Sequence, residues 1–247
     1  MKIKNILISQ PAPQNEKSPY FDLERKYGVK VDFRPFIEVK GYDIREFRKQ
    51  KVNILEHSAV IMTSKTAVDN YFRIAEDMRL TIPITMKFFC VTESIAYYLQ
   101  KYITYRKRKI FFAHKTFDEL LEIMSKHRKE KFLLPVAKIH KATISKKLKT
   151  AGFSFSKAVM YETVSADLSD LSDIHYDVIV FFSPIGIKSL FDNFPDFEQN
   201  GRIIAALGKS TAIAVKKAGL RLDINAPTKE YPSMTMAIEK FILENNK

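Results

Sequence analysis

The chain has 247 residues, of which 46% are hydrophobic and 28% charged, a composition typical of a folded globular protein. It holds no run of about 18 apolar residues, so no membrane-spanning helix is expected, and its single cysteine, Cys90, excludes an intrachain disulfide and fits a reducing cytoplasm. The net charge of +13 indicates an acidic partner (nucleic acid, anionic lipid or a polyanionic small molecule), unless it reflects only a basic solvated surface.

Short apolar runs alternate with amphipathic runs along the chain. Residues 5–9 are predicted to form a first strand that prolines bring to an end, and their apolar run is too short for a signal peptide. Residues 20–28 favour a helix closed by Gly28, and residues 29–33 favour a second strand. Further strand–helix units are predicted to begin near Val60, Phe89, Ile110 and Phe132, and again near Val178, Ile204 and Leu222.

Much of the second half of the chain repeats the first half. The matched blocks share an apolar run, a serine or threonine turn and an amphipathic run, in one order and at a slowly drifting shift. The matched pairs are 60–72 with 179–191, 91–96 with 207–212, and 110–114 with 223–227, at shifts of 119 (179 − 60), 116 (207 − 91) and 113 (223 − 110) positions. A duplicated unit with small deletions is the simplest reading.

The repeat predicts the architecture. Its first copy has four strand–helix units and its second copy only three, so the N-terminal residues 5–33 are expected to supply the missing one. The fold class is then α/β, with two similar parallel-sheet, flavodoxin-like domains, one of them discontinuous, joined by a two-stranded β linker. The predicted boundaries are residues 1–34 with 166–247 for the first domain, 40–156 for the inserted second domain, and 35–39 and 157–165 for the linker strands.

Hydroxyl residues are expected at the N-caps of helices that follow four of the predicted strands. Parallel sheets bind ligands beyond the carboxyl ends of their strands, and helix N-termini attract anions through free N–H groups. The turns therefore favour a carboxylate- or phosphate-rich ligand, although Ser and Thr also cap helices without any further function. They are Thr63-Ser64-Lys65-Thr66, Thr92-Glu93-Ser94, Ser183-Pro184-Ile185-Gly186 and Gly208-Lys209-Ser210-Thr211.

Other motifs carry less weight. Gly208-Lys209-Ser210 resembles the end of a P-loop, but Ile203 stands where that motif needs glycine. Residues 106–109 form a basic run that could touch nucleic-acid phosphates, yet such a run is more typical of a solvated turn. Cys90 and the histidines lack metal-ligand spacing and are predicted to be packing or surface residues. The histidines are His57, His114, His127, His140 and His175.

The chain resembles the uroporphyrinogen-III synthase family over essentially its whole length. No single motif is diagnostic, and the order and spacing of several blocks carry the resemblance. These blocks are residues 60–72 with Thr63-Ser64, the turn at 182–186, residues 206–212, the C-terminal stretch 226–238, and the linker segment 159–163.

The resemblance implies a cofactor-free lyase of heme and tetrapyrrole biosynthesis with a cleft between two domains. Its substrate would be hydroxymethylbilane, a linear tetrapyrrole with eight carboxylates, which would explain the positive charge without nucleic acid. The enzyme would cyclise this substrate with loss of water and inversion of ring D. The family further implies a cytoplasmic monomer that meets porphobilinogen deaminase transiently. Two alternatives are an inactive anion-binding or regulatory module of the same fold and a periplasmic-type binding protein, which the absence of a signal peptide disfavours.

The resemblance also assigns residues. Tyr161 falls on the family's linker tyrosine and would donate a hydrogen bond to the departing hydroxyl; the other interpretation is a strand residue that fills the hinge. The remaining contacts would come from backbone amides of the four turns, with Gln10, Pro11 and Lys138 nearby. The chain departs from the family where Gln10 and Lys138 replace common arginines and where Glu93 puts a negative charge beside an anion site.

Overall fold

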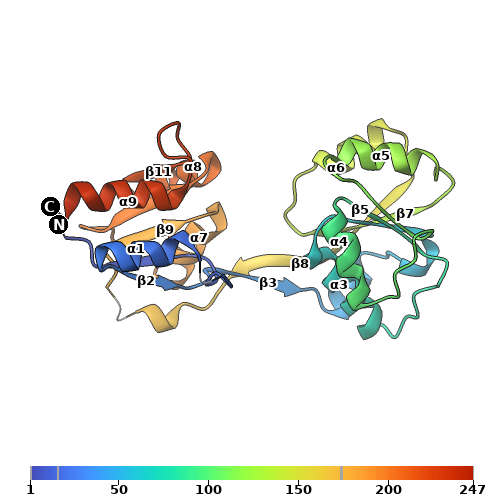
Figure 1. Ribbon diagram of the computed structural model, residues 1–247. Helices are drawn as coiled ribbons and strands as arrows, with labels where there is room; N and C mark the ends of the chain where they lie inside the picture. The colour runs from blue at the N-terminus through green and yellow to red at the C-terminus, as the bar shows by residue number, and fades with distance from the viewer. Residues whose placement is uncertain (1, 16, 173–174, 247) are drawn as a thin grey trace. The chain divides into compact units, whose positions relative to one another are not determined.

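The computed structural model describes residues 2–15, 17–172 and 175–246. The chain divides into two compact units, which we call unit 1 (Met1–Glu38 with Val164–Lys247) and unit 2 (Val39–Thr163). Each unit has its own parallel sheet and its own helices (Figure 1). Among the described residues, no helix has the length and apolarity needed to cross a lipid bilayer.

Unit 1 is a five-stranded sheet with helices on both faces. Ile6 and Ile8 pack with α1 and α9 on one face, whereas Leu7 packs with α7 and α8 on the other. Burial on both faces explains why these strands read as continuous apolar runs. The strands, all parallel and in the order β11-β10-β9-β1-β2, are β1 (Asn5–Ile8), β2 (Lys30–Phe33), β9 (Val178–Phe181), β10 (Ile203–Leu207) and β11 (Ile224–Ala226). The helices are α1 (Pro19–Tyr27), α7 (Pro184–Asn193), α8 (Lys209–Lys217) and α9 (Met234–Asn245).

Unit 2 holds a six-stranded sheet in the order β3-β8-β7-β4-β5-β6. Its core strands β4 to β8 pair in parallel, and its helices again cover both faces, α2 to α4 on one and α5 and α6 on the other. The strands are β3 (Ile37–Gly41), β4 (Ala59–Met62), β5 (Lys87–Cys90), β6 (Ile110–Phe112), β7 (Phe132–Ala137) and β8 (Phe155–Ser165). The helices are α2 (Ile44–Lys49), α3 (Lys65–Asp77), α4 (Glu93–Tyr98), α5 (Phe117–Ser125) and α6 (Thr143–Thr150).

The two sheets have the same spatial order and differ by a circular permutation. Unit 1 reads β2-β1-β9-β10-β11 across the sheet, and unit 2 reads β8-β7-β4-β5-β6. The strand pair that opens the chain in unit 1 therefore occupies the place that β7 and β8, which come last, occupy in unit 2. This is the flavodoxin-like order, and the predicted fold class of two parallel-sheet α/β units, one of them discontinuous, is confirmed.

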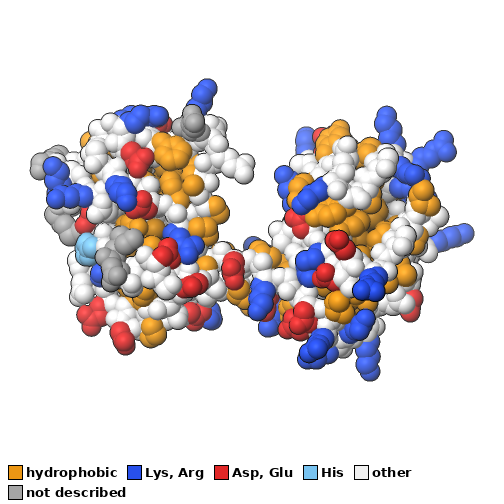
Figure 2. All heavy atoms as spheres, turned by 90° about the horizontal axis from the view of Figure 1, so that it is seen from below, with side chains coloured by type: hydrophobic (Ala, Val, Ile, Leu, Met, Phe, Trp, Pro, Cys, Tyr) orange, Lys and Arg blue, Asp and Glu red, His pale blue; other side chains and the backbone are white. Residues whose placement is uncertain are grey.

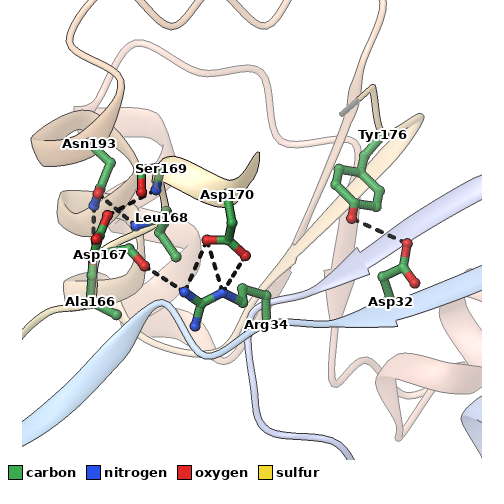
Figure 3. Close-up of polar contacts among 9 residues, drawn as sticks. All are labelled: Asp32, Arg34, Ala166, Asp167, Leu168, Ser169, Asp170, Tyr176 and Asn193. Atoms are coloured by element: carbon green, nitrogen blue, oxygen red, sulfur yellow. Dashed lines mark hydrogen bonds and ion pairs between the residues drawn. The ribbon is translucent and has the colours of Figure 1, made fainter. Parts of the chain in front are cut away.

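Polar side chains fasten the returning chain to unit 1 after β8 (Figure 3). The Arg34 guanidinium donates to the Asp170 carboxylate, with Nε 2.9 Å from Oδ2, and to the carbonyl oxygen of Asp167 at 2.7 Å. The hydrogen bond from Arg34 lowers the pKa of Asp170 below its usual range. This anchor joins Arg34, which directly follows β2, to residues 167–170, which lie more than a hundred positions later in the chain.

A second anchor lies at the end of α7. The Asn193 side chain donates to the carbonyl oxygen of Ala166 and accepts from the backbone N–H of Leu168, both at 2.9 Å. The hydroxyl of Tyr176 donates to Asp32 at 3.2 Å, and burial is the main cause that raises the pKa of Tyr176 to about 12. The Asn193 side chain thus supplies hydrogen-bond partners to the backbone groups of Ala166 and Leu168, which no helix or strand pairs.

Candidate functional site

In a doubly wound sheet the strand order reverses at one place. The loops that leave the two strands at this place turn to opposite faces and open a crevice beyond their carboxyl ends. In unit 2 the reversal lies between β4, which leads to α3, and β7, which leads to α6; in unit 1 it lies between β9 and β1. These two places are where a ligand is expected in each unit.

Unit 2 has a cavity of about 310 Å³ at its reversal point. Thr63 borders it from the end of β4 and Tyr161 from β8, and α6 and the loop before it supply most of the remaining wall. The complete lining is Thr63, Leu134, Val136, Ala137, His140, Lys141, Thr143, Ile144, Ser145 and Tyr161. An apolar floor with a few convergent polar groups is typical of small-molecule sites.

Tyr161 owes its position to an irregularity in β8. Val136 pairs with Val159 but the next residue of β7, Ala137, pairs with Tyr161, so Met160 is an extra residue in the strand. Strict alternation would place Tyr161 on the face of Val159, yet its ring packs against the same cluster as Met160, on the α3 side. A bulge re-aims a side chain in this way and is common beside active sites.

Lys138, predicted as a substrate contact, is engaged within the protein. Its Nζ lies 2.8 Å from Oε2 of Glu162, and this hydrogen bond raises the pKa of Lys138. Its backbone N–H donates to the carbonyl oxygen of Tyr161 at 2.8 Å, which pins the loop after β7 to the bulged strand. The lysine side chain is more than half exposed, so the ion pair is accessible to a competing carboxylate.

Sequence reasoning missed His140, Lys141 and Ser145 as cavity residues. The spacing of the histidines along the chain indicates only that they are not metal ligands and carries no information about this cavity. The overlooked signal was topological: these residues follow the strand predicted from Phe132, and in this fold the loop after that strand borders the reversal point.

The turn after β4 forms much as expected. Ser64 caps α3, since its Oγ accepts from the N–H of Ala67 at 3.0 Å. The N–H groups of Lys65 and Thr66 belong to the first helical turn, which has no intrahelical acceptors. The Lys65 ammonium lies 5.2 Å above the ring of Tyr98, which turns this cation toward α4.

The turn after β5 differs from the prediction. Thr92 occupies the N-cap of α4 but makes no side-chain cap, and its Oγ1 lies 3.0 Å from Oγ of Ser94 instead. Two neighbouring hydroxyls thus satisfy each other rather than the helix. Glu93 opens the helix as an exposed acidic residue.

In unit 1, Ser183 caps α7 through a hydrogen bond of 3.3 Å from the N–H of Gly186 to its Oγ. Pro184 has no N–H, so Ile185 is the residue of this turn with an amide available to a ligand. Across the reversal point, the backbone N–H of Ser9 donates to Val180 at 3.1 Å, and Gln10 and Pro11 follow as exposed residues.

The turn after β10 also corrects the prediction. Gly208 itself is the N-cap of α8, with φ 89°, so no hydroxyl caps this helix. Lys209 and Ser210 are exposed, but Thr211 is buried, so its side chain is not available to a ligand. Lys209 borders a cavity of about 260 Å³ together with Lys216.

A larger cavity of about 560 Å³ in unit 1 lies away from these loops. Its wall includes Arg202, just before β10, and residues 194–198, just after α7. It therefore opens near the amino ends of the strands, where this fold does not place its ligands.

Metal or thiol chemistry finds no support in the described residues. Residues 2–15, 17–172 and 175–246 contain no group of three His, Cys, Asp or Glu that could hold a metal ion. Cys90 lies buried in β5, and burial raises the pKa of its thiol to about 12, so the thiolate is disfavoured. Nucleophilic cysteine chemistry is therefore not expected here.

Comparison with known proteins agrees with the fold and indicates a family. A family model described as uroporphyrinogen-III synthase HemD matches residues 19–236. Among curated protein sequences, none matches the chain significantly. The structure of uroporphyrinogen-III synthetase from Helicobacter pylori 26695 is similar, with 19% identity and a TM-score of 0.58, over 98% of this chain and 100% of that one.

A mutant uroporphyrinogen III synthase from the extremely thermophilic bacterium Thermus thermophilus has 13% identity and a TM-score of 0.49, over 98% of this chain and 99% of that one. At 19% identity, the Helicobacter pylori structure supports the fold, whereas the family model spans most of the sequence. The chain belongs to the uroporphyrinogen-III synthase HemD family.

Proposed function

We propose that Tyr161 and the loops at the carboxyl ends of the strands carry out the reaction of this family. The chain is a cyclising lyase of tetrapyrrole biosynthesis that closes hydroxymethylbilane with loss of water and inversion of ring D. In this reaction the terminal hydroxyl leaves, the substituted carbon of ring D attacks to form a spiro intermediate, and the ring reopens and closes with ring D inverted.

The chemistry sets two demands on the protein. Unassisted closure gives the uninverted isomer, so the enzyme must hold the flexible substrate in the conformation that leads to inversion, which is catalysis by positioning. Hydroxide is also a poor leaving group, and a positioned O–H donor assists its departure. A phenol meets the second demand without a metal ion.

The observation that carries this proposal is the place of Tyr161. Its side chain borders the cavity at the reversal point of unit 2, where a β-bulge turns its ring toward the α3 side of the sheet. A strand residue with only a packing role requires no such irregularity. The position of the phenol beside a cavity with polar groups therefore favours the catalytic interpretation over the structural one.

Substrate carboxylates would be held by helix N-termini and by lysines around them. The first turns of α3 and α8 offer the N–H groups of Lys65, Thr66, Lys209 and Ser210, and α7 offers that of Ile185. Backbone donors of this kind tolerate changes in side chain. Thr63, Gln10, Pro11 and Lys138 stay proposed contacts, and the α4 turn is the weakest because Glu93 repels a carboxylate.

We further propose that the protein acts as a cytoplasmic monomer that receives its unstable substrate during transient contact with porphobilinogen deaminase. Sedimentation of the chain with and without the deaminase tests this point. A stable dimer or a long-lived complex would contradict it.

A coupled assay tests the activity. A deaminase generates hydroxymethylbilane from porphobilinogen, this protein is added, and the oxidised products are separated into uroporphyrin isomers I and III. We expect isomer III to rise in proportion to the protein. Isomer I alone, from a sample with a cooperative unfolding transition, would favour the inactive anion-binding module instead.

A further inference from the structure

We propose that His140 is a second catalytic residue of the unit 2 cavity, with Nε2 as the acceptor of the proton that the substrate loses when the macrocycle closes. The inference rests on the proposed function and adds a residue that neither the family match nor the sequence analysis assigns. It is carried by one hydrogen bond, the cavity and the proton balance of the reaction.

The hydrogen bond fixes the tautomer of the imidazole. Nδ1 of His140 lies 2.7 Å from the carbonyl oxygen of Ala137. A carbonyl oxygen only accepts, so Nδ1 must carry the hydrogen, and in the neutral ring Nε2 then holds a lone pair. Within the described residues, no side chain or backbone group is hydrogen-bonded to Nε2. The ring is thus oriented as a base whose reactive atom is available.

The same backbone segment holds His140 and Tyr161 together. Ala137, which orients the imidazole, is the residue of β7 that pairs with Tyr161, and the N–H of Lys138 donates to the Tyr161 carbonyl at 2.8 Å. Both side chains border the cavity of about 310 Å³. A phenol that donates and an imidazole that accepts therefore share one site, oriented by backbone contacts that exist before any substrate binds.

Ser145 gives independent support for a polar ligand in this cavity. The residue is only 8% exposed, it borders the cavity, and its Oγ has no hydrogen-bond partner in the described residues. Buried hydroxyls in proteins are nearly always hydrogen-bonded, so an unpartnered one beside a cavity indicates a group that a bound molecule satisfies.

The proton balance requires such an acceptor. The C–O bond to the terminal carbon breaks while Tyr161 donates a proton to the leaving oxygen, which departs as water. The terminal carbon bonds to the substituted carbon of ring D and gives the spiro intermediate. The bond from that carbon to the bridging carbon of ring C then breaks, and this bridging carbon finally bonds to the unsubstituted ring D carbon next to the nitrogen, which still carries a hydrogen. The electron pair of that C–H bond restores the pyrrole, and the proton passes to Nε2 of His140. Return of this proton through solvent to the tyrosine oxygen leaves both side chains unchanged, and the net loss from the substrate is one water.

Two substitutions separate the functions of the two nitrogens. The amide N–H of His140→Asn replaces the Nδ1 donor to Ala137, and the amide oxygen of His140→Gln replaces Nε2 as a hydrogen-bond acceptor that cannot take up a proton. We expect both variants to lose kcat by about 100-fold or more, the usual contribution of general acid–base catalysis, with KM changed only a few-fold. Added imidazole should partly restore kcat in His140→Ala, and His114→Asn, an exposed loop histidine of the same unit, should match the wild type.

Each outcome of these measurements supports or overturns the assignment of His140 as the proton acceptor. A His140→Gln variant with wild-type kcat would reduce Nε2 to a hydrogen-bond acceptor and overturn proton transfer. Wild-type kcat in all His140 variants would overturn the assignment, while isomer III from the wild type would still uphold the synthase. If the wild type forms only isomer I, both proposals fail. Unfolding midpoints identify any variant that loses activity by misfolding, and imidazole rescue of the folded His140→Ala protein then decides alone.

Discussion

Units 1 and 2 share one strand order but differ sharply in charge. Residues 39–163 hold 25 Lys and Arg against 12 Asp and Glu, whereas the remaining residues hold 16 of each, so the whole net charge of +13 belongs to unit 2. In Figure 2, Lys and Arg side chains project around this unit, which carries α3 to α6 in Figure 1. Since both units adopt the same strand order with these different compositions, we attribute the excess to the ligand rather than to the fold.

The candidate reactive groups, like the excess positive charge, lie in unit 2 rather than in unit 1. At the reversal point of unit 2 lie a cavity, a tyrosine placed by a bulge and an oriented histidine. The reversal point of unit 1 has a capped helix, α7, and the polar residues Ser9 and Gln10. The two units thus share a scaffold, while the excess charge and the candidate reactive groups lie in unit 2. We therefore expect unit 2 to attract the polyanionic substrate and to carry out the proton transfers.

The largest expected effect is on turnover when Tyr161 is changed to Phe. Loss of the hydroxyl should lower kcat by about 100-fold or more, because the leaving oxygen loses its donor, with little effect on the unfolding midpoint. The coupled isomer assay measures it. Tyr27→Phe, which removes a hydroxyl that donates to Glu239 in unit 1, is the matched control and should keep full activity. Equal turnover in both variants would remove Tyr161 from the mechanism.

The next effect tests whether the two cores are equivalent despite the charge difference. Phe181 of β9 and Phe89 of β5 are both fully buried, against Phe36 and Phe132 respectively. Replacement of either by Ala should cost roughly 3–5 kcal/mol of unfolding free energy, since each leaves a cavity in a packed sheet. Urea unfolding gives the values. A much smaller cost in unit 2 would mean that its excess charge goes with a looser core.

The charge difference itself predicts a smaller kinetic effect. Reversal of two exposed cations of unit 2, in K107E/R108E, should lower kcat/KM several-fold at low salt, because attraction of a polyanion speeds its association. The matched change in unit 1, K2E/K217E, should have less effect, and about 0.5 M salt should abolish the difference. Identical losses in the two double variants would refute preferential attraction by unit 2.

The smallest effect concerns one ion pair in each unit at acid pH. The hydrogen bond from Arg34 lowers the pKa of Asp170. For Glu130, burial is the largest single effect and raises the pKa, but the hydrogen bonds from Lys87 and Ser58 and the nearby positive charge together outweigh it and lower the pKa. A carboxyl with a lowered folded-state pKa contributes stability above its unfolded pKa of about 4 and loses it as pH falls through the folded value.

Asp170→Asn and Glu130→Gln should therefore flatten the loss of stability between about pH 5 and pH 3. The effect should be larger for Glu130, because the Lys87–Glu130 pair is mostly buried and Asp170 is exposed to solvent that screens it. Thermal unfolding across this range measures both. A larger change in Asp170→Asn would reverse this ranking.

The helix caps show which local features could be predicted from the sequence. Gly28 closes α1 with φ 63°, as predicted, because a left-handed C-cap favours glycine wherever it occurs. Ser64 and Ser183 cap their helices for a similarly local reason, a short side chain three residues before a free N–H. Thr92 and Gly208 departed from the same expectation because the choice of cap depended on the neighbouring Ser94 and on the backbone conformation at Gly208.

The sequence by itself determined the α/β class, the duplication, the discontinuous first unit and the family, since apolar runs, turn residues and block order are local signals that repeat along the chain. Only the tertiary structure decided that Met160 is an extra residue, that Tyr161 borders a cavity and that Ala137 orients His140. The physical reason is that strand register and side-chain direction arise from contacts between β7 and β8, whose paired residues are more than twenty positions apart. The periodicity of either strand alone does not record which residue of its partner it will face.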